Sequence, residues 1–399
     1  MYPALAVAAQ LPKAAAAPKE RPASAENGPE AAPVDLLWVG SNDGMEQALV
    51  ERAGIRYQGI DTGKVRGVSV LTALTSTFKI GAGVRQSLAI LRQYQPNVCF
   101  VTGGYVCTPV AIACRLRRVP VLIYLPDMQP GWAIRALSYL AQRVAVSFPE
   151  VAGYFGGEAQ KTAGRGKAVV TGYPVRQALV DSAQGGHLDA AAHGQNRAVV
   201  RRQLANRLQR PLADRGQNGE TLPLVLVWGG SQGARKINQS TWQALPQLLP
   251  HAQILHVVGE RDWPLWEVWQ AAHPLAPDLA ACYHPVAYLH EEMVWALVAA
   301  DVTVARAGAS SLGEFPVARL PALLVPLLSV NQSQNAELLA KHGGAVIVAD
   351  AELKEKLAPT LLALLHDQPK RMAMEAALAH LAQPEAALNI ARELGRLAI

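Results

Sequence analysis

The sequence predicts two α/β domains, each built on a parallel, doubly wound sheet. Its 399 residues are about two and a half times the ~150-residue length of a typical domain. Short runs rich in β-branched residues alternate with longer amphipathic stretches, a pattern typical of parallel sheets covered by helices on both faces. Half of the residues are apolar and 17% are charged, which excludes a disordered or fibrous protein.

The first αβ series occupies residues 1–176, which we expect to form the N-terminal domain. A helix is expected from Tyr2 to Leu11. Residues 11–34 are rich in Ala, Pro, Glu and Ser and are predicted to be a flexible insertion. Strands are then expected at 35–40, 97–104, 120–125, 143–148 and 167–172, with helices at 46–54, 84–94, 108–117 and 133–142.

The second series is predicted to form a C-terminal domain over residues 221–383. The polar segment 177–220, with clustered Gly, Gln, Asn and Arg, is predicted to connect the two domains. The last helix, 384–399, begins with Pro and Glu, as helices often do, and is expected to pack back on the first domain. Strands of this series are expected at 224–230, 254–260, 302–308, 321–327 and 345–350.

The positive charge is concentrated in one part of the chain. Residues 52–176 contain sixteen Lys or Arg and four Asp or Glu, a balance of +12, against +6 for the whole chain. An anionic partner such as a membrane surface or a pyrophosphate is therefore expected, and a merely solvated basic face is the alternative. No nucleic-acid-binding motif occurs, so we expect no nucleic-acid partner.

Two further classes of protein are excluded by the sequence. No stretch of 18 or more apolar residues is present, so no membrane-spanning segment is expected. The four cysteines form no C-x-x-C pair and have no histidine at ligand spacing, which argues against a disulfide scaffold or a zinc site.

A glycine-rich loop follows the strand expected at 224–230 and precedes an amphipathic helix. Glycines let backbone N–H groups approach an anion, and the N-terminus of the following helix favours negative charge. The loop therefore indicates a phosphate site, although many such turns serve only packing. Its residues are Gly229, Gly230, Ser231, Gln232, Gly233 and Ala234.

A second loop of small residues follows the strand expected at 302–308. It leads into a helix with Glu314 one turn inside, where a carboxylate is placed to accept both hydroxyls of a ribose. The alternative is that Glu314 only complements the helix N-terminus. Two such loops in one domain favour a nucleotide site.

These motifs together resemble the MurG family of glycosyltransferases. The matching segments are, in family order, YPALAVAAQL, GGYV with Pro109, TGYPVR, GGSQGARKIN, ADVTVARAGASSLGE, LPALLVP and Q-x-x-NA. They extend over nearly the whole chain outside 11–34 and 183–220.

The resemblance implies a GT-B fold, with two Rossmann-like domains facing a cleft. It also implies an inverting hexosyltransferase that moves N-acetylglucosamine from UDP-GlcNAc to the C4 hydroxyl of the muramoyl sugar of lipid I (undecaprenyl-pyrophosphoryl-MurNAc-pentapeptide), forming lipid II. The enzyme would act in peptidoglycan synthesis, and so in cell-wall biogenesis, cell shape and division. No cofactor and no bound metal are implied.

The resemblance also places the substrates on particular residues. The glycine-rich loop would bind the diphosphate, Glu314 the ribose, Gln332 the sugar, and Leu289 the uracil. The substrate-binding residues implied are Asp127, Arg176, Ser231, Leu289, Ala309, Ser310, Ser311, Leu312, Gly313, Glu314 and Gln332, with Gly103, Gly104 and Tyr105 on the acceptor side.

One family motif has no counterpart in this sequence. The family has a first strand and a GGTGGH-type loop before the segment that here begins Met1-Tyr2-Pro3. That loop would bind the acceptor pyrophosphate, and its histidine would be the general base. The general base is therefore open, and Asp127, which stands where the family has an asparagine, is a weak candidate. Either the chain is an inactive paralogue, or its start is assigned too far downstream.

Membrane contact is expected from the N-terminal domain, at the cytoplasmic side of the cell membrane. Apolar residues alternate with basic ones beside the implied acceptor site, a pattern that suits an interface with anionic lipid, although some of them would be ordinary core. They are Phe78, Ile80, Val84 and Leu88, with Lys79, Arg85 and Arg92. Two other functions stay open: a related UDP-sugar glycolipid transferase, and a non-catalytic protein that binds sugar nucleotides.

Overall fold

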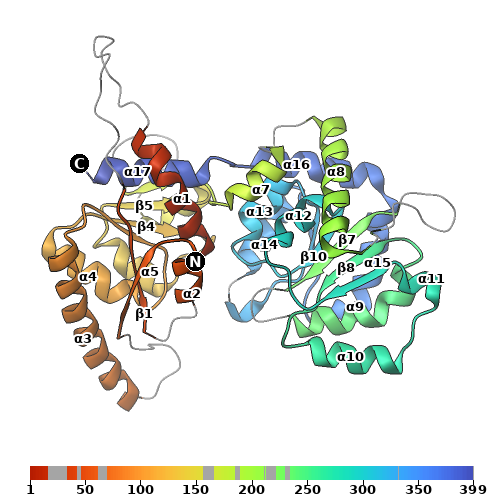
Figure 1. Ribbon diagram of the computed structural model, residues 1–399, viewed down its shortest axis with the longest axis horizontal. Coiled ribbons are helices and arrows are strands. Elements are labelled where there is room, and N and C mark those ends of the chain that lie inside the picture. The colour runs from red at the N-terminus through yellow and green to blue at the C-terminus, as the bar shows by residue number, and fades with distance from the viewer. Residues whose placement is uncertain are drawn as a thin grey trace, which may run out of the picture. The chain divides into compact units, whose positions relative to one another are not determined.

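A computed structural model describes most of the chain, which divides into two compact units. The N-terminal unit is Met1–Arg176 with Glu385–Ile399, and the C-terminal unit is Gln177–Pro384 (Figure 1). The described residues are 1–16, 34–42, 46–61, 70–155, 166–184, 189–210, 212, 222–229, 234–330 and 332–398.

The strands of the N-terminal unit fall into two parallel sheets. One sheet is the pair β1 (Leu37–Ser41) and β2 (Arg56–Ile60); the other has the order β3 (Cys99–Val101), β4 (Val121–Leu125), β5 (Arg143–Val146), β6 (Ala168–Val170). The parallel α/β organisation expected for this unit is present, with its described strands in two separate groups. In a doubly wound sheet of order 3-2-1-4-5-6, the position between these two groups belongs to strand 1. No described strand takes that position here.

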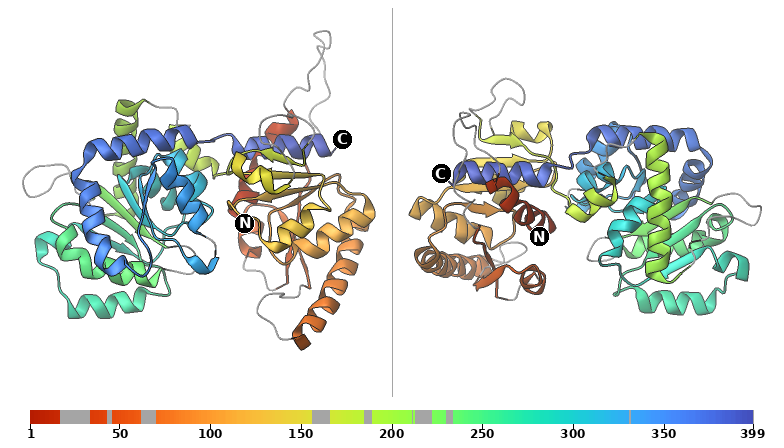
Figure 2. Two further views of the ribbon diagram at one scale, coloured as in Figure 1. Left: turned by 180° about the vertical axis from the view of Figure 1, so that it is seen from behind. Right: turned by 45° about the horizontal axis from the view of Figure 1, so that its top comes forward.

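The helices of this unit include both ends of the chain. Figure 2 shows the last helix, α17, beside the first, α1, and the two pack against each other. Ile390, Ala391 and Leu394 lie on the buried face of α17. The helices are α1 (Tyr2–Ala16), α2 (Gln47–Arg52), α3 (Val70–Tyr94), α4 (Cys107–Arg117), α5 (Trp132–Ser138), α6 (Pro149–Ala152) and α17 (Ala386–Leu397).

The predicted flexible insertion begins later than expected. Residues 11–16 continue α1, because the alanine-rich sequence there has the highest helix propensity and Pro12 is accommodated inside the helix. The remainder, 17–33, lies outside the described residues.

The C-terminal unit contains one parallel sheet of six strands. Its order is β12-β11-β10-β7-β8-β9. The strands are β7 (Leu224–Trp228), β8 (Gln253–Val257), β9 (Tyr283–Val286), β10 (Val302–Ala305), β11 (Ala322–Leu324) and β12 (Ala345–Ile347). Two of the described strands, β2 and β9, were not expected, because both are short and neither forms an apolar run. Strand β2 carries an exposed Arg56 and Gln58, and β9 contains Pro285.

Helices cover both faces of this sheet. One face packs under α9 and α15, with Trp242 and Trp266 in the core; α8 and α12 lie together on the other face. The helices are α7 (Gln177–Ser182), α8 (Ala190–Leu208), α9 (Arg235–Leu248), α10 (Trp263–Ala272), α11 (Pro277–Ala280), α12 (Glu292–Ala299), α13 (Ser311–Ala318), α14 (Ser333–Lys341), α15 (Leu353–His366) and α16 (Gln368–Leu381). No helix among the described residues is long and apolar enough to cross a bilayer.

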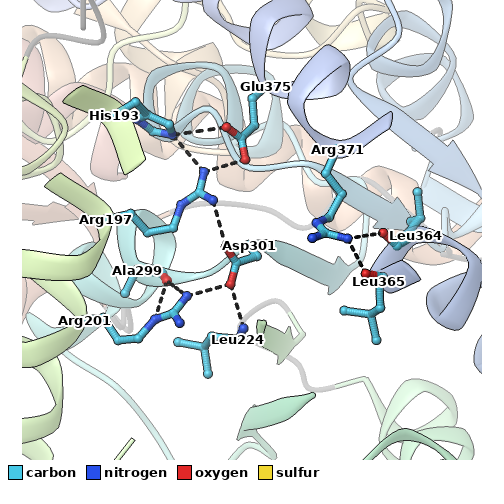
Figure 3. Close-up of polar contacts among 10 residues, drawn as sticks. All are labelled: His193, Arg197, Arg201, Leu224, Ala299, Asp301, Leu364, Leu365, Arg371 and Glu375. Atoms are coloured by element: carbon cyan, nitrogen blue, oxygen red, sulfur yellow. Dashed lines mark hydrogen bonds and ion pairs between the residues drawn. The ribbon is translucent and has the colours of Figure 1, made fainter. Parts of the chain in front are cut away.

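The segment 177–220, predicted to be only a connection, contains α7 and α8. A buried ion-pair network holds α8 to the C-terminal unit (Figure 3). Arg197 donates to Asp301 at 2.8 Å and to Glu375 at 2.6 Å, and Arg201 donates to the other oxygen of Asp301 at 2.6 Å. The side chain of Arg201 is only 8% exposed. Helix α8 is therefore an integral part of this unit.

Candidate functional site

The candidate site lies at the carboxyl edge of the six-stranded sheet, where open α/β sheets bind their ligands. Strands β7, β10, β11 and β12 are neighbours and parallel, so the loops that follow them leave the same edge. The glycine-rich loop follows β7. Gly229 is half-buried at its start, whereas Gly230, Ser231, Gln232 and Gly233 lie outside the described residues. Helix α9 begins directly after this loop.

The loop after β10 is closed by its own hydrogen bonds. The hydroxyl of Ser311 donates to the carbonyl of Gly308 at 2.6 Å, and the backbone N–H of Glu314 donates to that of Ser310 at 2.8 Å. Ser311, Leu312 and Gly313 are buried, whereas Ala309, Ser310 and Glu314 are half-buried. Of the six residues expected here, the three buried ones therefore shape the turn. The three half-buried ones are accessible to a ligand.

The loop after β11 is attached to the loop after β10. The side-chain amide of Asn335 donates to the carbonyl of Ala307 at 3.1 Å. Gln332 accepts a hydrogen bond from the backbone N–H of Leu327 at 3.1 Å through its side-chain oxygen. The side-chain oxygen of Gln332 is thus bonded within its own loop, and the predicted contact with a sugar would use its amide nitrogen, which is a donor.

The residue expected at the uracil lies after β9. Leu289 is 6% exposed, while Tyr288 before it is 47% exposed and contacts the ring of His290. Because the Leu289 side chain is buried, a ligand could reach only its backbone groups, and the contact with uracil that the resemblance implies stays a prediction.

A buried polar network fixes the start of α9. Arg235 donates twice to Asp262 Oδ1, at 3.1 and 3.0 Å, and Asn238 donates to Asp262 Oδ2 at 3.0 Å. The Asn238 oxygen accepts from His256 Nε2 at 3.0 Å, which leaves His256 Nδ1 to accept from the Tyr283 hydroxyl at 2.8 Å. Burial lowers the pKa of His256 to about 3, so its ring is neutral.

Sequence reasoning missed this network and a second anchor, Asp350, which pairs with Lys236 and Arg306. Its members are far apart in the chain, and each is an ordinary polar residue in its own segment. A basic residue directly after the glycine-rich loop was the one visible signal.

The residues expected on the acceptor side lie in the N-terminal unit. Gly103 and Gly104 have φ of +99° and +95°, a backbone conformation that favours glycine, and Tyr105 is 47% exposed. The thiol of Cys107, the first residue of α4, donates to the carbonyl of Gly103 at 2.7 Å. Loop and helix are thus held together, with backbone N–H groups at the N-terminus of α4.

The two remaining site residues also lie in this unit. Asp127 is half-buried just after β4. Burial raises the pKa of the Tyr124 hydroxyl, and the nearby charge of Asp127 raises it further. Arg176 stacks over the ring of Tyr2 at 5.6 Å from its centroid.

Comparison with known proteins identifies the family. The Glycosyltransferase family 28 N-terminal domain matches residues 25–146, and the Glycosyltransferase family 28 C-terminal domain matches 224–390. The crystal structure of MurG from Acinetobacter baumannii superimposes with a TM-score of 0.68 and 26% identity, over 99% of this chain and 95% of that one.

Two relatives carry the name UDP-N-acetylglucosamine--N-acetylmuramyl-(pentapeptide) pyrophosphoryl-undecaprenol N-acetylglucosamine transferase. The one from Roseiflexus sp. (strain RS-1) is 37% identical over 395 residues, covering 91% of this chain and 84% of its own. The one from Moorella thermoacetica (strain ATCC 39073 / JCM 9320) is 34% identical over 394 residues, covering 97% and 92%. The chain belongs to the MurG family. The resemblance and the predicted GT-B fold are thereby confirmed.

More distant structures share the MurG fold alone. UDP-GlcNAc 2-epimerase from Neisseria meningitidis, bound to UDP-GlcNAc, superimposes with a TM-score of 0.63 at 13% identity. The roles that the MurG resemblance implies for single residues of this chain stay predictions.

Proposed function

We propose that this chain is the inverting hexosyltransferase that moves N-acetylglucosamine from UDP-GlcNAc to the C4 hydroxyl of the muramoyl sugar of lipid I, forming lipid II for peptidoglycan synthesis. The observation that carries this function is membership of the MurG family over both family domains. The position of the expected donor segments at the carboxyl edge of the C-terminal sheet, where open α/β sheets bind nucleotides, supports it.

The reaction is a single displacement. A base takes the proton of the acceptor C4 hydroxyl while its oxygen attacks the anomeric carbon, and the bond from that carbon to the UDP oxygen breaks with inversion. In our proposal, the N-termini of α9 and α13 stabilise the negative charge on the departing diphosphate. Glu314 accepts the ribose hydroxyls, and Gln332 donates to the transferred sugar. Asp127 is the candidate base among the described residues.

Transfer is tested with the full chain, UDP-GlcNAc labelled in the sugar, and a lipid I analogue. Label in the disaccharide product, at a rate proportional to enzyme concentration, is the expected result. UDP-GlcNAc binding without transfer to this acceptor, but with transfer to another glycolipid, would favour the related transferase. Binding without any transfer would favour the non-catalytic sugar-nucleotide protein. Absence of binding contradicts all three.

We also propose that the N-terminal unit binds an anionic membrane surface at the cytoplasmic side of the cell membrane. Helices α4 and α5 are in contact, and both expose large apolar side chains: Leu116 of α4 is 64% exposed and Trp132 of α5 is 93% exposed, and Tyr139, directly after α5, is 83% exposed. The same helices expose Arg115, Arg117, Arg118 and Arg135. No Asp or Glu occurs between residues 62 and 126. Exposed aromatic rings among arginines suit an interface with anionic lipid.

The segment first expected at the membrane is less favourable for this role. Ile80, Val84 and Leu88 are half-buried along α3, and the side chains of Phe78 and Lys79 lie outside the part that the structure describes. Arg85 and Arg92 are exposed and extend the basic surface. Trp132 of α5 and Tyr139 directly after it therefore carry the proposal.

Vesicle sedimentation tests the membrane proposal. The chain should bind vesicles with phosphatidylglycerol more tightly than pure phosphatidylcholine, and Trp132→Ser should weaken binding roughly tenfold through lost apolar burial. Val268→Ser is the matched control, because Val268 is 72% exposed in the other unit. Equal binding by the wild type and Trp132→Ser would contradict a role for α5.

A further inference from the structure

Asp350 links loops that belong to different strands of the six-stranded sheet. It lies just after β12, and its carboxylate accepts from Arg306 Nη1 at 2.6 Å on one oxygen and from Lys236 Nζ at 2.6 Å on the other. Arg306 follows β10 directly, and Lys236 is the second residue of α9, after β7. Two strands, β11 and β10, separate β12 from β7 in the sheet. One carboxylate thus bridges segments across the carboxyl edge.

Arg306 is the buried member of this bridge. Its side chain is 9% exposed, and Nη1 also donates to the carbonyl of Val325, just after β11, at 3.1 Å. Its Nε is buried and has no hydrogen-bond partner among the described residues. A guanidinium in such a place depends strongly on its carboxylate. Burial raises the pKa of Asp350, but the hydrogen bonds from Lys236 and Arg306 outweigh it and leave the pKa below its usual value, so the carboxylate stays ionised.

Both partners of Asp350 lead into the proposed donor loops. Arg306 precedes Gly308, where the turn into α13 is closed, and Lys236 lies in the first turn of the helix after the glycine-rich loop. The pair with Lys236 contributes little to stability, because that side chain is 61% exposed. Its consequence is geometric: it fixes the N-terminus of α9 relative to the loop after β10.

We propose that Asp350 is a positioning residue for the UDP-GlcNAc donor, holding the start of α9 and the loop after β10 in register through Lys236 and Arg306. The proposal rests on the function proposed above. In this proposal, Asp350 contacts neither the sugar nor the reacting atoms. It acts through the side chains of Lys236 and Arg306.

The test combines calorimetry with UDP and transfer kinetics on the full chain. Asp350→Asn keeps the shape of the side chain but removes its charge, so the Kd for UDP and the KM for UDP-GlcNAc should rise about tenfold, equivalent to about 1.4 kcal/mol. The kcat should change less than about threefold, because the reacting groups are untouched. Asp350→Glu should recover most of the affinity. A purely structural role would not separate KM from kcat in this way.

Glu352→Gln is the matched control. Glu352 lies in the same segment. Among the described residues it forms an exposed ion pair with Lys356, one helical turn away. It loses the same charge two residues from Asp350 and should leave the Kd for UDP unchanged. Lys236→Met gives an independent measurement if Asp350→Asn does not fold: its Kd for UDP should rise about threefold.

The outcomes distinguish the two proposals. If the wild type binds no UDP, the proposed function fails, and the positioning role fails with it. If the wild type binds UDP but Asp350→Asn or Lys236→Met binds it equally well, the positioning role alone is overturned. A fall in kcat at constant KM, or an equal effect of Glu352→Gln, also overturns it.

Discussion

At the residue scale, the loop after β10 combines buried residues that shape the turn with half-buried residues that are predicted to face a ligand. The Ser311 hydroxyl closes the turn onto Gly308, and Leu312 packs inward at 1% exposure. Glu314 is half-buried at the same helix start. Substitution of Ser311 or Leu312 would alter the fold of the turn and the ligand site together. Glu314 is therefore the residue at which a ribose contact is tested most directly.

We predict that Glu314→Gln weakens UDP binding by roughly 1–3 kcal/mol, because charge-assisted hydrogen bonds to the ribose hydroxyls become neutral ones. Isothermal titration calorimetry with the full chain measures the effect. A nucleotide without the two ribose hydroxyls should bind the wild type and the variant alike. Glu337→Gln, an exposed position on α14, serves as control. Equal UDP affinity in Glu314→Gln would remove Glu314 from the site.

The loops of this site could be predicted from the sequence, but the polar contacts that anchor them could not. A β-branched run, small residues and a helix are local patterns. They correctly identified the strand and the helix in each of the segments 224–238 and 302–315, whereas residues 230–233 between the first pair lie outside the described residues. Asn238, Asp262 and Asp350 act on residues up to 114 positions away. A contact between such distant polar residues leaves no periodic trace, so the anchors became visible only with the fold.

At the element scale, α8 shows how a polar segment becomes part of a core. Its sequence has little apolar periodicity and contains Gly194, which explains why a connection was predicted instead. Asp189 was the overlooked signal: its side chain accepts from the backbone N–H of Ala192 at 2.8 Å and caps the helix. Val200 and Leu204 of this helix are buried, and Arg197 and Arg201 donate to Asp301.

Asp301 is accordingly the residue on which the attachment of α8 depends. It accepts from both arginines and from the backbone N–H of Leu224, the first residue of β7, at 2.7 Å. Burial raises the pKa of Asp301, but the charges of Arg201 and Arg197 outweigh it, so the net pKa is lowered and the carboxylate is ionised. We predict that Asp301→Asn lowers the free energy of unfolding by about 3–5 kcal/mol, because it leaves the buried Arg201 guanidinium without a carboxylate and Arg197 with Glu375 alone.

Urea unfolding followed by tryptophan fluorescence measures this loss. Glu292→Gln is the control. Glu292 is the first residue of α12 and pairs with Arg207 of α8, whose side chain is 57% exposed. That exposed pair should contribute less than about 1 kcal/mol. Equal stabilities of Asp301→Asn and Glu292→Gln would mean that apolar packing alone attaches α8.

At the scale of the whole molecule, histidines are confined to one unit. All ten lie between residues 187 and 380, so the N-terminal unit, 1–176 with 385–399, contains none. Three of the ten are buried with lowered pKa. Burial is the main cause in each case, and it lowers the pKa to about 4 for His193, about 3 for His256 and about 4 for His284. Arg197 and Arg319 contribute at His193, and Arg210 at His284.

We predict that acid destabilises the C-terminal unit selectively. The unfolded state takes up protons near pH 6.5, whereas the three native rings stay neutral down to about pH 4, so the stability of this unit falls as the pH drops from 6.5 towards 4 and is complete above 6.5. Between pH 7 and pH 5, each ring should cost roughly 1–2 kcal/mol and the three together about 3–5 kcal/mol.

Six of the eight tryptophans lie between residues 228 and 295, so their fluorescence during urea unfolding reports this unit. The variant His284→Gln should reduce the difference between the two pH values by about a third, and the exposed His380→Gln should leave it unchanged. Hydrogen exchange read strand by strand at both pH values should show the effect in β7–β12 and not in β3–β6. An equal loss in both sheets would assign the acid sensitivity to carboxylates, which occur in both units, instead of the buried histidines.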